Sequence, residues 1–188
     1  MKSRPKLIVV TGRPGAGKTS LSKILSESLY LPLVSRDAIK EGYVHSFGVR
    51  HDELPPDANG TATDIFFANI EWLLSNGVSL IAEAAFQHKV WESRMPALRG
   101  QGAIVFVICD VDAETAASRH LGRGLDDPKR EFFHGDNRVT HFRKTGELLA
   151  PGEYVPPALD VPTIVVSTSD GYSPPLEELE ALIRERLK

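Results

Sequence analysis

The chain has 188 residues, of which 41% are hydrophobic, 25% charged and 7% aromatic, as in an ordinary globular domain. Its 22 basic and 25 acidic side chains leave a formal charge of −3, which argues against a protein whose main partner is a nucleic-acid backbone. The single cysteine, Cys109, excludes an intramolecular disulfide and a zinc site built from several cysteines. The length predicts one domain over residues 1–188.

The N-terminal segment is basic, but the apolar stretch behind it covers only residues 7–10. A secretory signal needs about 7–15 apolar residues at that place, and a membrane span needs about 20. We therefore expect a soluble, cytoplasmic protein with no membrane partner.

Short apolar runs rich in β-branched residues alternate along the chain with segments of helical spacing. The predicted strands are residues 7–10, 31–34, 78–82, 103–109 and 163–166. Three of these runs are nearly continuous rather than alternating, which suits strands covered by helices on both faces. The alternation predicts an α/β fold with a five-stranded, mostly parallel sheet flanked by helices.

The helical segments have recognisable ends. Thr61 and Asp64 suit the start of a helix that Asn76 and Gly77 end. Ser173 is the predicted N-cap of the last helix, with prolines in its first turn.

Two segments break the alternation of strands and helices. Residues 51–60 contain a Pro-Pro and an Asn-Gly pair, which predict a loop. Residues 122–161 have no clean periodicity, and an irregular segment of that length in a compact domain is typically a functional lid or disordered.

The strongest motif is GRPGAGKT at residues 12–19, a complete G-x-x-x-x-G-K-[ST] pattern (Walker A) between a predicted strand and a predicted helix. Its glycines let backbone N–H groups wrap an anion, and the positive end of the following helix adds to the attraction. The alternative is a glycine-rich turn from strand to helix in which the lysine has no role in binding. The predicted nucleotide-binding residues are Gly12, Arg13, Pro14, Gly15, Ala16, Gly17, Lys18, Thr19 and Ser20.

Within this loop, Lys18 is expected to reach the β- and γ-phosphates and so to act in catalysis, while the hydroxyl of Thr19 coordinates Mg²⁺. The chain has no N-K-x-D motif for reading guanine, which argues against a GTPase. ATP and Mg²⁺ are the expected cofactors.

In the order of its elements the whole chain resembles the small P-loop kinases. This group, related to AAA-type ATPases, includes gluconate and shikimate kinases, chloramphenicol phosphotransferase, polynucleotide 5′-kinase and zeta-type toxins. Besides the P-loop, three places carry the resemblance. They are Ser35-Arg36-Asp37 after the second strand, Glu83 where relatives often have aspartate, and Arg119 with Arg123, like the arginines that begin the family's lid.

The resemblance implies a three-layer P-loop NTPase fold with a lid over about residues 119–158. It also implies that Asp37 orients the acceptor hydroxyl and takes its proton, a role that suits a carboxylate at the carboxyl edge of the sheet. The alternative role for Asp37 is to cap the helix that follows. Arg36 either binds an anionic group of the acceptor or is simply exposed.

Glu83 ends an apolar strand, so its carboxylate needs a partner. It holds Mg²⁺ through water, contacts the acceptor, or forms a structural ion pair. Arg119 and Arg123 stand at i, i+4 on a predicted helix, so they share one face. The resemblance implies that both close over the β,γ-phosphates as lid arginines do, and the alternative is a solvated basic loop. Arg130, Arg138 and Arg143 are further cations of the same region.

Two weaker signals remain. The resemblance places Thr168 beside the adenine, although an ordinary strand-to-helix turn has the same composition. His120, His134 and His141 fall in the lid, but their spacing fits no standard zinc pattern, and their role stays open.

The leading hypothesis is an ATP- and Mg²⁺-dependent kinase, a phosphotransferase that acts on a hydroxyl of a small-molecule acceptor. The sparse aromatic residues near the expected acceptor site disfavour a nucleic-acid acceptor. The alternative is an ATP-binding switch, accessory protein or ATPase without such an acceptor. Asp37 together with Glu83 favours the kinase, because a switch has less reason to place two carboxylates at that edge.

Overall fold

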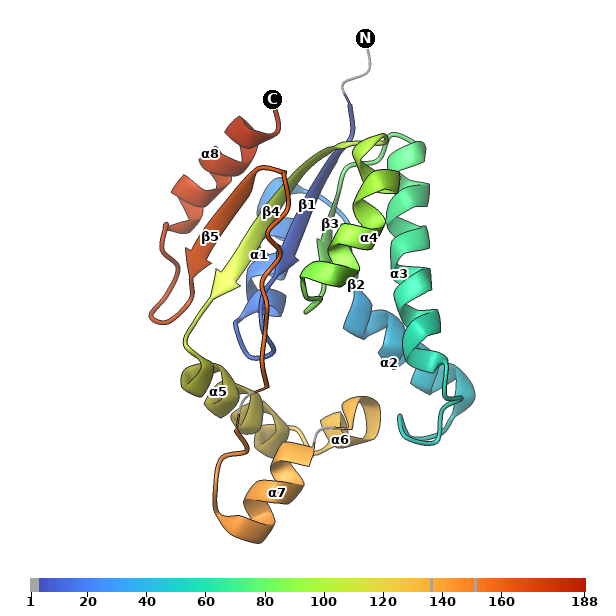
Figure 1. The fold of residues 1–188 in the computed structure, drawn as a ribbon, viewed down its shortest axis with the longest axis vertical. Coiled ribbons are helices and arrows are strands. Elements are labelled where there is room, and N and C mark those ends of the chain that lie inside the picture. The colour runs from blue at the N-terminus through green and yellow to red at the C-terminus, as the bar shows by residue number, and fades with distance from the viewer. Residues whose placement is uncertain (1–3, 136, 151) are drawn as a thin grey trace.

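The computed structural model describes residues 4–135, 137–150 and 152–188 (Figure 1). The described strands are β1 (Lys6–Thr11), β2 (Leu33–Ser35), β3 (Leu80–Glu83), β4 (Ala103–Asp110) and β5 (Thr163–Ser167). They form one sheet in the order β2-β3-β1-β4-β5, and every neighbouring pair is parallel. The predicted five-stranded α/β sheet is confirmed.

The strands alternate with helices that are unequal in length. The described helices are α1 (Lys18–Leu29), α2 (Arg36–Phe47), α3 (Ala58–Ser75), α4 (His88–Arg99), α5 (Ala113–Asp126), α6 (Lys129–His134), α7 (Asn137–Thr145) and α8 (Leu176–Arg186). None of these helices is both long and apolar enough to cross a membrane.

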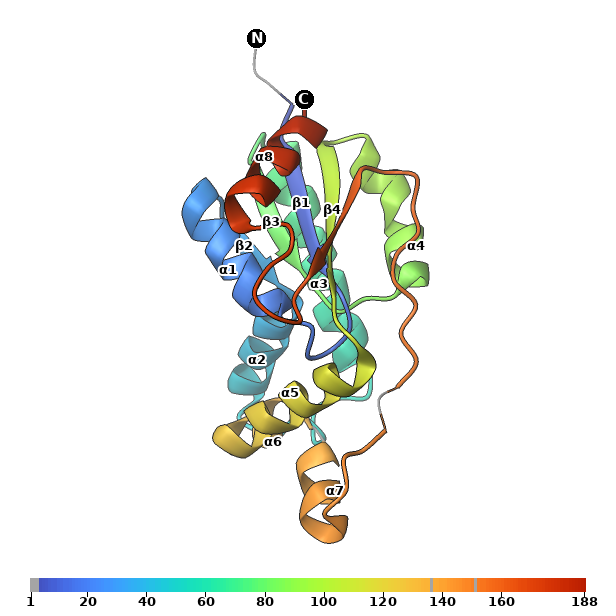
Figure 2. The ribbon, with the colours of Figure 1, turned by 90° about the vertical axis from the view of Figure 1, so that its left-hand side faces the viewer.

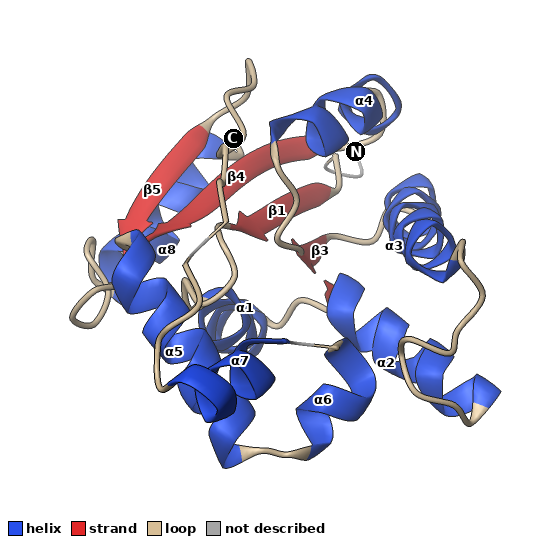
Figure 3. Cartoon of the chain, turned by 60° about the horizontal axis from the view of Figure 1, so that its bottom comes forward, coloured by secondary structure: helices blue, strands red, loops and turns tan. Residues whose placement is uncertain are grey.

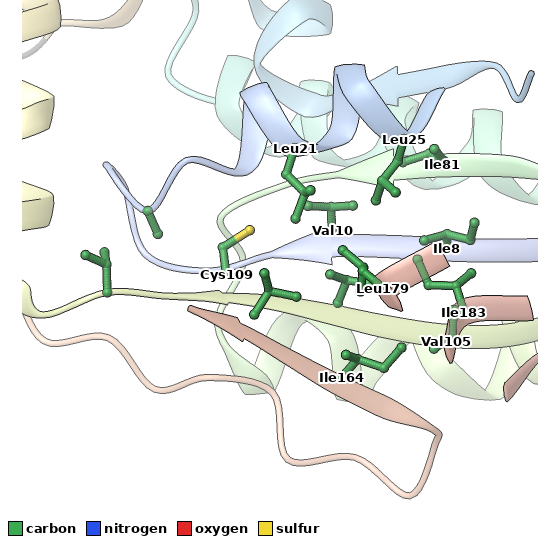
Figure 4. Packing of buried hydrophobic residues seen from close by; sticks show 14 of the residues in the cluster. Ile8, Val10, Leu21, Leu25, Ile81, Val105, Cys109, Ile164, Leu179 and Ile183 are labelled. Carbon is green, nitrogen blue, oxygen red and sulfur yellow. The ribbon is translucent and has the colours of Figure 1, made fainter. Parts of the chain in front are cut away.

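Helices cover both faces of the sheet, so the fold has three layers (Figures 1 and 2). On one face, alternate strand residues such as Ile8 and Val105 pack against Leu21 of α1 and Ile183 of α8 (Figure 4). The intervening strand residues pack on the other face against α3 and α4, around the buried Trp91. Because successive side chains point to opposite faces, burial of both faces explains the continuous apolar runs.

The remaining helices lie beyond the carboxyl ends of the strands. Figure 3 shows α2, α5, α6 and α7 around this edge, and Figure 1 shows residues 152–162 running along the sheet to the start of β5. This arrangement places the loop after β1, the start of α2 and the helices α5, α6 and α7 around one edge of the sheet.

Two helix starts differ from the sequence prediction. Helix α3 begins at Ala58, with Asp57 at its N-cap, so the predicted loop is three residues too long. The predicted N-cap at Ser173 is wrong, because Pro175 holds that position. Ser173 instead forms an antiparallel bridge with Ser167, which engages its backbone N–H and C=O before the helix begins.

The segment 122–161 also differs from its prediction as an irregular stretch, since it contains α6 and α7. The physical reason is burial. Helix α6 has no buried residue, and Val139 is the one buried residue of α7. Helices that bury so little surface need no apolar stripe, and the stripe is the signal that sequence periodicity detects.

Candidate active site

The loop between β1 and α1 has the backbone geometry of a phosphate-binding loop. Gly12, Gly15 and Gly17 have φ values of 145°, 89° and 76°, a region that side chains disfavour. A Cβ atom added to Gly15 would lie 2.0 Å from the carbonyl oxygen of Ala116 in α5. Glycine is therefore required at this position by both conformation and close packing.

Lys18 is the first residue of α1 and is 7% exposed. Its Nζ donates a hydrogen bond to the carbonyl oxygen of Arg13 at 3.0 Å, so the ammonium group lies over the loop. Burial lowers the pKa of Lys18, and the negative charge of Glu83 opposes this shift. The loop thus holds a desolvated cation, which interacts strongly with anions that reach it.

Glu83 ends β3 beside the end of β2 and is 3% exposed. Ser35 Oγ donates a hydrogen bond of 2.8 Å to Glu83 Oε2. Burial raises the pKa of Glu83, whereas the positive charge of Lys18 and the Ser35 hydrogen bond oppose the shift. The carboxyl group that the sequence placed at the end of a strand therefore has a hydroxyl partner and a nearby cation.

Asp37 lies in the first turn of α2 and does not cap it. The helix begins at Arg36, so Ser35 is the N-cap, and its Oγ accepts from the backbone N–H of Ala38 at 3.5 Å. The capping alternative for Asp37 is therefore wrong. Its side chain is 58% exposed and lies 3.5 Å from Arg36 Nη1. The carboxylate is available at the surface of a cleft.

This cleft has a volume of about 610 Å³. Sequence-predicted residues from four separate segments line it, namely Pro14, Gly15, Lys18, Thr19, Arg36, Asp37, Glu83, Arg123, Arg130 and Arg138. His120 and His134 line it as well, whereas Arg143 and His141 are not among its lining residues. Sheet topology thus brings the P-loop, the start of α2 and the helices beyond the sheet edge to one cavity.

A second hollow of about 560 Å³ lies on the other side of the P-loop, lined by Gly15, Gly17, Ser20, Arg119, Gly122, Arg123, Asp126, Thr168, Gly171 and Tyr172. Thr168 Oγ1 donates a hydrogen bond to the carbonyl oxygen of Ala16 at 3.1 Å, and Thr168 is 6% exposed. The residue therefore ties the loop after β5 to the P-loop.

The two arginines of α5 lie in different surroundings. Arg119 donates to the carbonyl oxygens of Thr168 and Ser169, at 2.9 and 2.8 Å, and lines only the second hollow. Arg123 lines both hollows. The structure therefore places Arg123 beside the cleft that contains Lys18, and holds Arg119 against the loop that follows β5.

Sequence reasoning missed Lys40 and Glu41 in the wall of the cleft. Glu41 Oε1 lies 2.8 Å from His134 Nε2 and so connects α2 to α6. Burial lowers the pKa of His134, and the nearby Arg130 lowers it further. Lys40 gave one available signal, its position four residues after Arg36, which puts both cations on one side of a helix.

Comparisons with known proteins agree with this fold. A family model described as an AAA domain (AAA_33) matches residues 7–143. Adenylate kinase 1 of Nostoc sp. (strain PCC 7120 / SAG 25.82 / UTEX 2576) is 28% identical over 140 residues, which cover 67% of this chain and 73% of that protein.

Solved structures extend the similarity over the whole chain. A putative kinase from Chloroflexus aurantiacus j-10-fl is 26% identical with a TM-score of 0.78, covering 99% of this chain and 100% of that one. A gluconokinase from Sinorhizobium meliloti 1021 (20% identity, TM-score 0.51, 98% and 90% covered) and the Mycobacterium tuberculosis APS kinase CysC (13%, 0.60, 96% and 98%) share the fold. The chain belongs to the AAA domain family, within which it has the fold of a P-loop kinase-like domain.

Proposed function

We propose that this protein is an ATP- and Mg²⁺-dependent phosphotransferase that moves the γ-phosphate of ATP to a hydroxyl of a small-molecule acceptor. The observation that carries the proposal is the position of Asp37. An exposed carboxylate that caps no helix shares one cleft with the P-loop Lys18 and with Glu83. The relatives named as kinases support phosphotransfer from a nucleotide.

The nucleotide end of the site would bind ATP with its phosphates on the P-loop. Lys18 offsets negative charge on the β- and γ-phosphates, as does Arg123 from α5. The hollow between Arg119, Thr168 and Tyr172 offers a place for the base. In this arrangement Arg119 shapes the base pocket through its two carbonyl contacts, and Arg123 faces the phosphates.

The donor set also fits a magnesium ion. Thr19 supplies a hydroxyl next to Lys18, and Glu83 supplies a buried carboxyl group in the same cleft. Thr19 would hold the ion directly and Glu83 through water. When bound, Mg²⁺ neutralises charge that develops on the β,γ-phosphate oxygens.

At the acceptor end, Asp37 accepts the proton of the acceptor hydroxyl while that oxygen attacks the γ-phosphorus. A new P–O bond forms to the acceptor, and the bond between the γ-phosphorus and the β,γ-bridging oxygen breaks. The electron pair of that bond leaves with ADP, and the proton stays on the Asp37 carboxylate. Positioned general bases contribute about 10²- to 10⁴-fold to a rate.

The test is an assay of ADP release with Mg·ATP and a panel of hydroxylated metabolites, sugars, nucleosides and antibiotics, together with AMP and 5′-hydroxyl oligonucleotides. Release that rises with one small hydroxyl acceptor, and that Asp37→Asn abolishes, is the expected result. Stimulation by AMP alone would point to a phosphate acceptor instead. ATP hydrolysis that no acceptor stimulates and Asp37→Asn leaves intact would favour the ATPase or switch.

A further inference from the structure

Lys40 is a buried lysine of α2. It lines the cleft at its α2 side and is 9% exposed. Among the residues that the structure describes, its side chain makes no hydrogen bond or ion pair. Burial lowers the pKa of Lys40, Arg36 lowers it further, and Asp37 opposes both. A buried ammonium that forms no ion pair destabilises the folded protein, because Asp37 only partly offsets the desolvation.

Arg36 stands one helical turn before Lys40, and the pair is unfavourable in two further ways. Like charges at i, i+4 repel each other. Arg36 also lies in the first turn of α2, where the partial positive charge of the helix N-terminus disfavours cations. The repulsion between the two cations and the charge of the helix N-terminus therefore both destabilise this arrangement in the protein without a ligand.

The structure nevertheless holds Arg36 firmly in place. Its Nη2 donates to the side-chain and main-chain oxygens of Asn59 in α3, at 3.1 and 3.3 Å. Its Nε is buried and has no hydrogen-bond partner among the described residues. Asn59 thus positions a guanidinium that retains an unused donor.

Two of the three carboxylates in the wall of the cleft are engaged elsewhere. Glu83 accepts from Ser35, and Glu41 is paired with His134 of α6. Asp37 in the first turn of α2 is the one carboxylate of the three whose negative charge reaches Arg36 and Lys40. Facing α2 from α6, Arg130 adds a further positive charge to the same cavity.

We propose that the phosphoryl acceptor carries an anionic group, a carboxylate or a phosphate, which Lys40 and Arg36 bind beside Asp37. This inference rests on the proposed function, because it assigns the α2 end of the cleft to the acceptor. Since Asp37, Arg36 and Lys40 line one cleft, the hydroxyl and the anionic group belong to one small molecule. Hydroxy acids and sugar phosphates have this chemistry, whereas neutral polyols do not.

The test uses the full chain saturated with Mg²⁺ and AMPPNP, so that the P-loop phosphate sites are filled. Inorganic phosphate is titrated while the ¹⁵N side-chain signals of Lys40 and Arg36 are followed by NMR. Matched sets then compare glycerol with glycerate and glycerol 3-phosphate, and ribose with ribonate and ribose 5-phosphate. Within each set, comparing the carboxylate with the phosphate identifies which anion the site binds more tightly.

We expect phosphate to shift both side-chain signals, and anionic members of each set to bind at least tenfold more tightly than the neutral parent. Lys40→Met and Arg36→Met should each weaken anion binding at least tenfold while AMPPNP binding is retained. Lys89→Met, which removes an exposed lysine of α4, is the matched control. Lys40→Met should also raise the Tm of the nucleotide-free protein, because it removes a buried unpaired charge.

Two results would overturn the inference. One is equal binding of neutral and anionic probes, and the other is phosphate binding that Lys40→Met leaves unchanged. Turnover distinguishes this failure from that of the proposed function. Anion binding that depends on Lys40, without any phosphorylated product, would support the anion site and refute the proposed kinase activity. Turnover of a neutral acceptor that depends on Asp37, and whose rate Lys40→Met does not lower, would support the kinase activity and refute the anion site.

Discussion

Ser35 Oγ donates a hydrogen bond to Glu83 Oε2 across the neighbouring strands β2 and β3, and accepts one from the backbone N–H of Ala38. One hydroxyl thus joins the start of α2, which carries Asp37, to the buried carboxyl group beside Lys18. The two halves of the proposed reaction, the phosphate site and the acceptor site, are connected at this point.

Glu83→Gln should change how stability depends on pH. Because burial raises the pKa of Glu83 in the folded protein, the folded state binds more protons than the unfolded chain between the ordinary and the raised pKa. The wild-type free energy of unfolding therefore falls as pH rises through that window, and the variant lacks this fall.

Urea unfolding of the nucleotide-free protein at a series of pH values from about 4 to 8 measures the difference. The variant should gain stability relative to wild type as pH rises. Glu27→Gln, at an exposed position of α1, is the control and should follow the wild-type profile. Parallel profiles for Glu83→Gln and wild type would contradict the assignment of a costly buried carboxylate.

Asp37→Asn should lower kcat by about 10²- to 10⁴-fold, the usual contribution of a positioned general base. The affinity for ATP should stay within about threefold, because Asp37 lies on α2 and not on the P-loop. Steady-state kinetics with the identified acceptor, together with calorimetric binding of AMPPNP, separates the two effects. Asp160→Asn removes an exposed carboxylate far from the cleft and serves as the control. Equal losses in kcat and ATP affinity would count against the role.

Gly15→Ala should destabilise the protein by about 2–5 kcal/mol, because a left-handed backbone and an overlap with the Ala116 carbonyl act together. ATP binding should be lost with it, since the loop must shift to relieve the overlap. Gly60→Ala is the matched control. It lies in α3 with open space around its Cβ position, so it should stabilise the protein by about 0.5–1 kcal/mol. Thermal melts of both variants decide the point, and a stable, ATP-binding Gly15→Ala would refute the packing argument.

Arg119 and Arg123 should differ in their kinetic effects. Arg119→Met removes the two hydrogen bonds to the loop after β5, so it should raise KM for ATP about tenfold and leave kcat within about threefold. Arg123→Met should lower kcat by at least about tenfold, because that side chain lines the cleft with Lys18. Saturation kinetics in ATP distinguishes them. Identical profiles for the two variants would show that both arginines act on the phosphates, as the sequence alone suggested.

Sequence periodicity predicted β1, β3 and β4 because helices cover these strands on both faces, so each needs a nearly continuous apolar run. The edge strands β2 and β5 are less buried, and their short β-branched runs were the signal. It missed α6 and α7 because those helices bury almost nothing. It also mistook the Ser173 turn for a helix cap, since serine followed by proline suits both, and the bridge to Ser167 depends on a partner strand.

The sequence by itself determined the P-loop, its position between a strand and a helix, and the residues at strand ends, because these signals are local in the chain. Tertiary structure decided which of those residues meet. Strand order β2-β3-β1 brings Ser35 to Glu83 across 48 positions of sequence, and the return of β5 brings Thr168 to Ala16 across 152. It also leaves Lys40 buried and unpaired within the described structure, a property that depends on what every neighbouring element contributes and that no local pattern encodes.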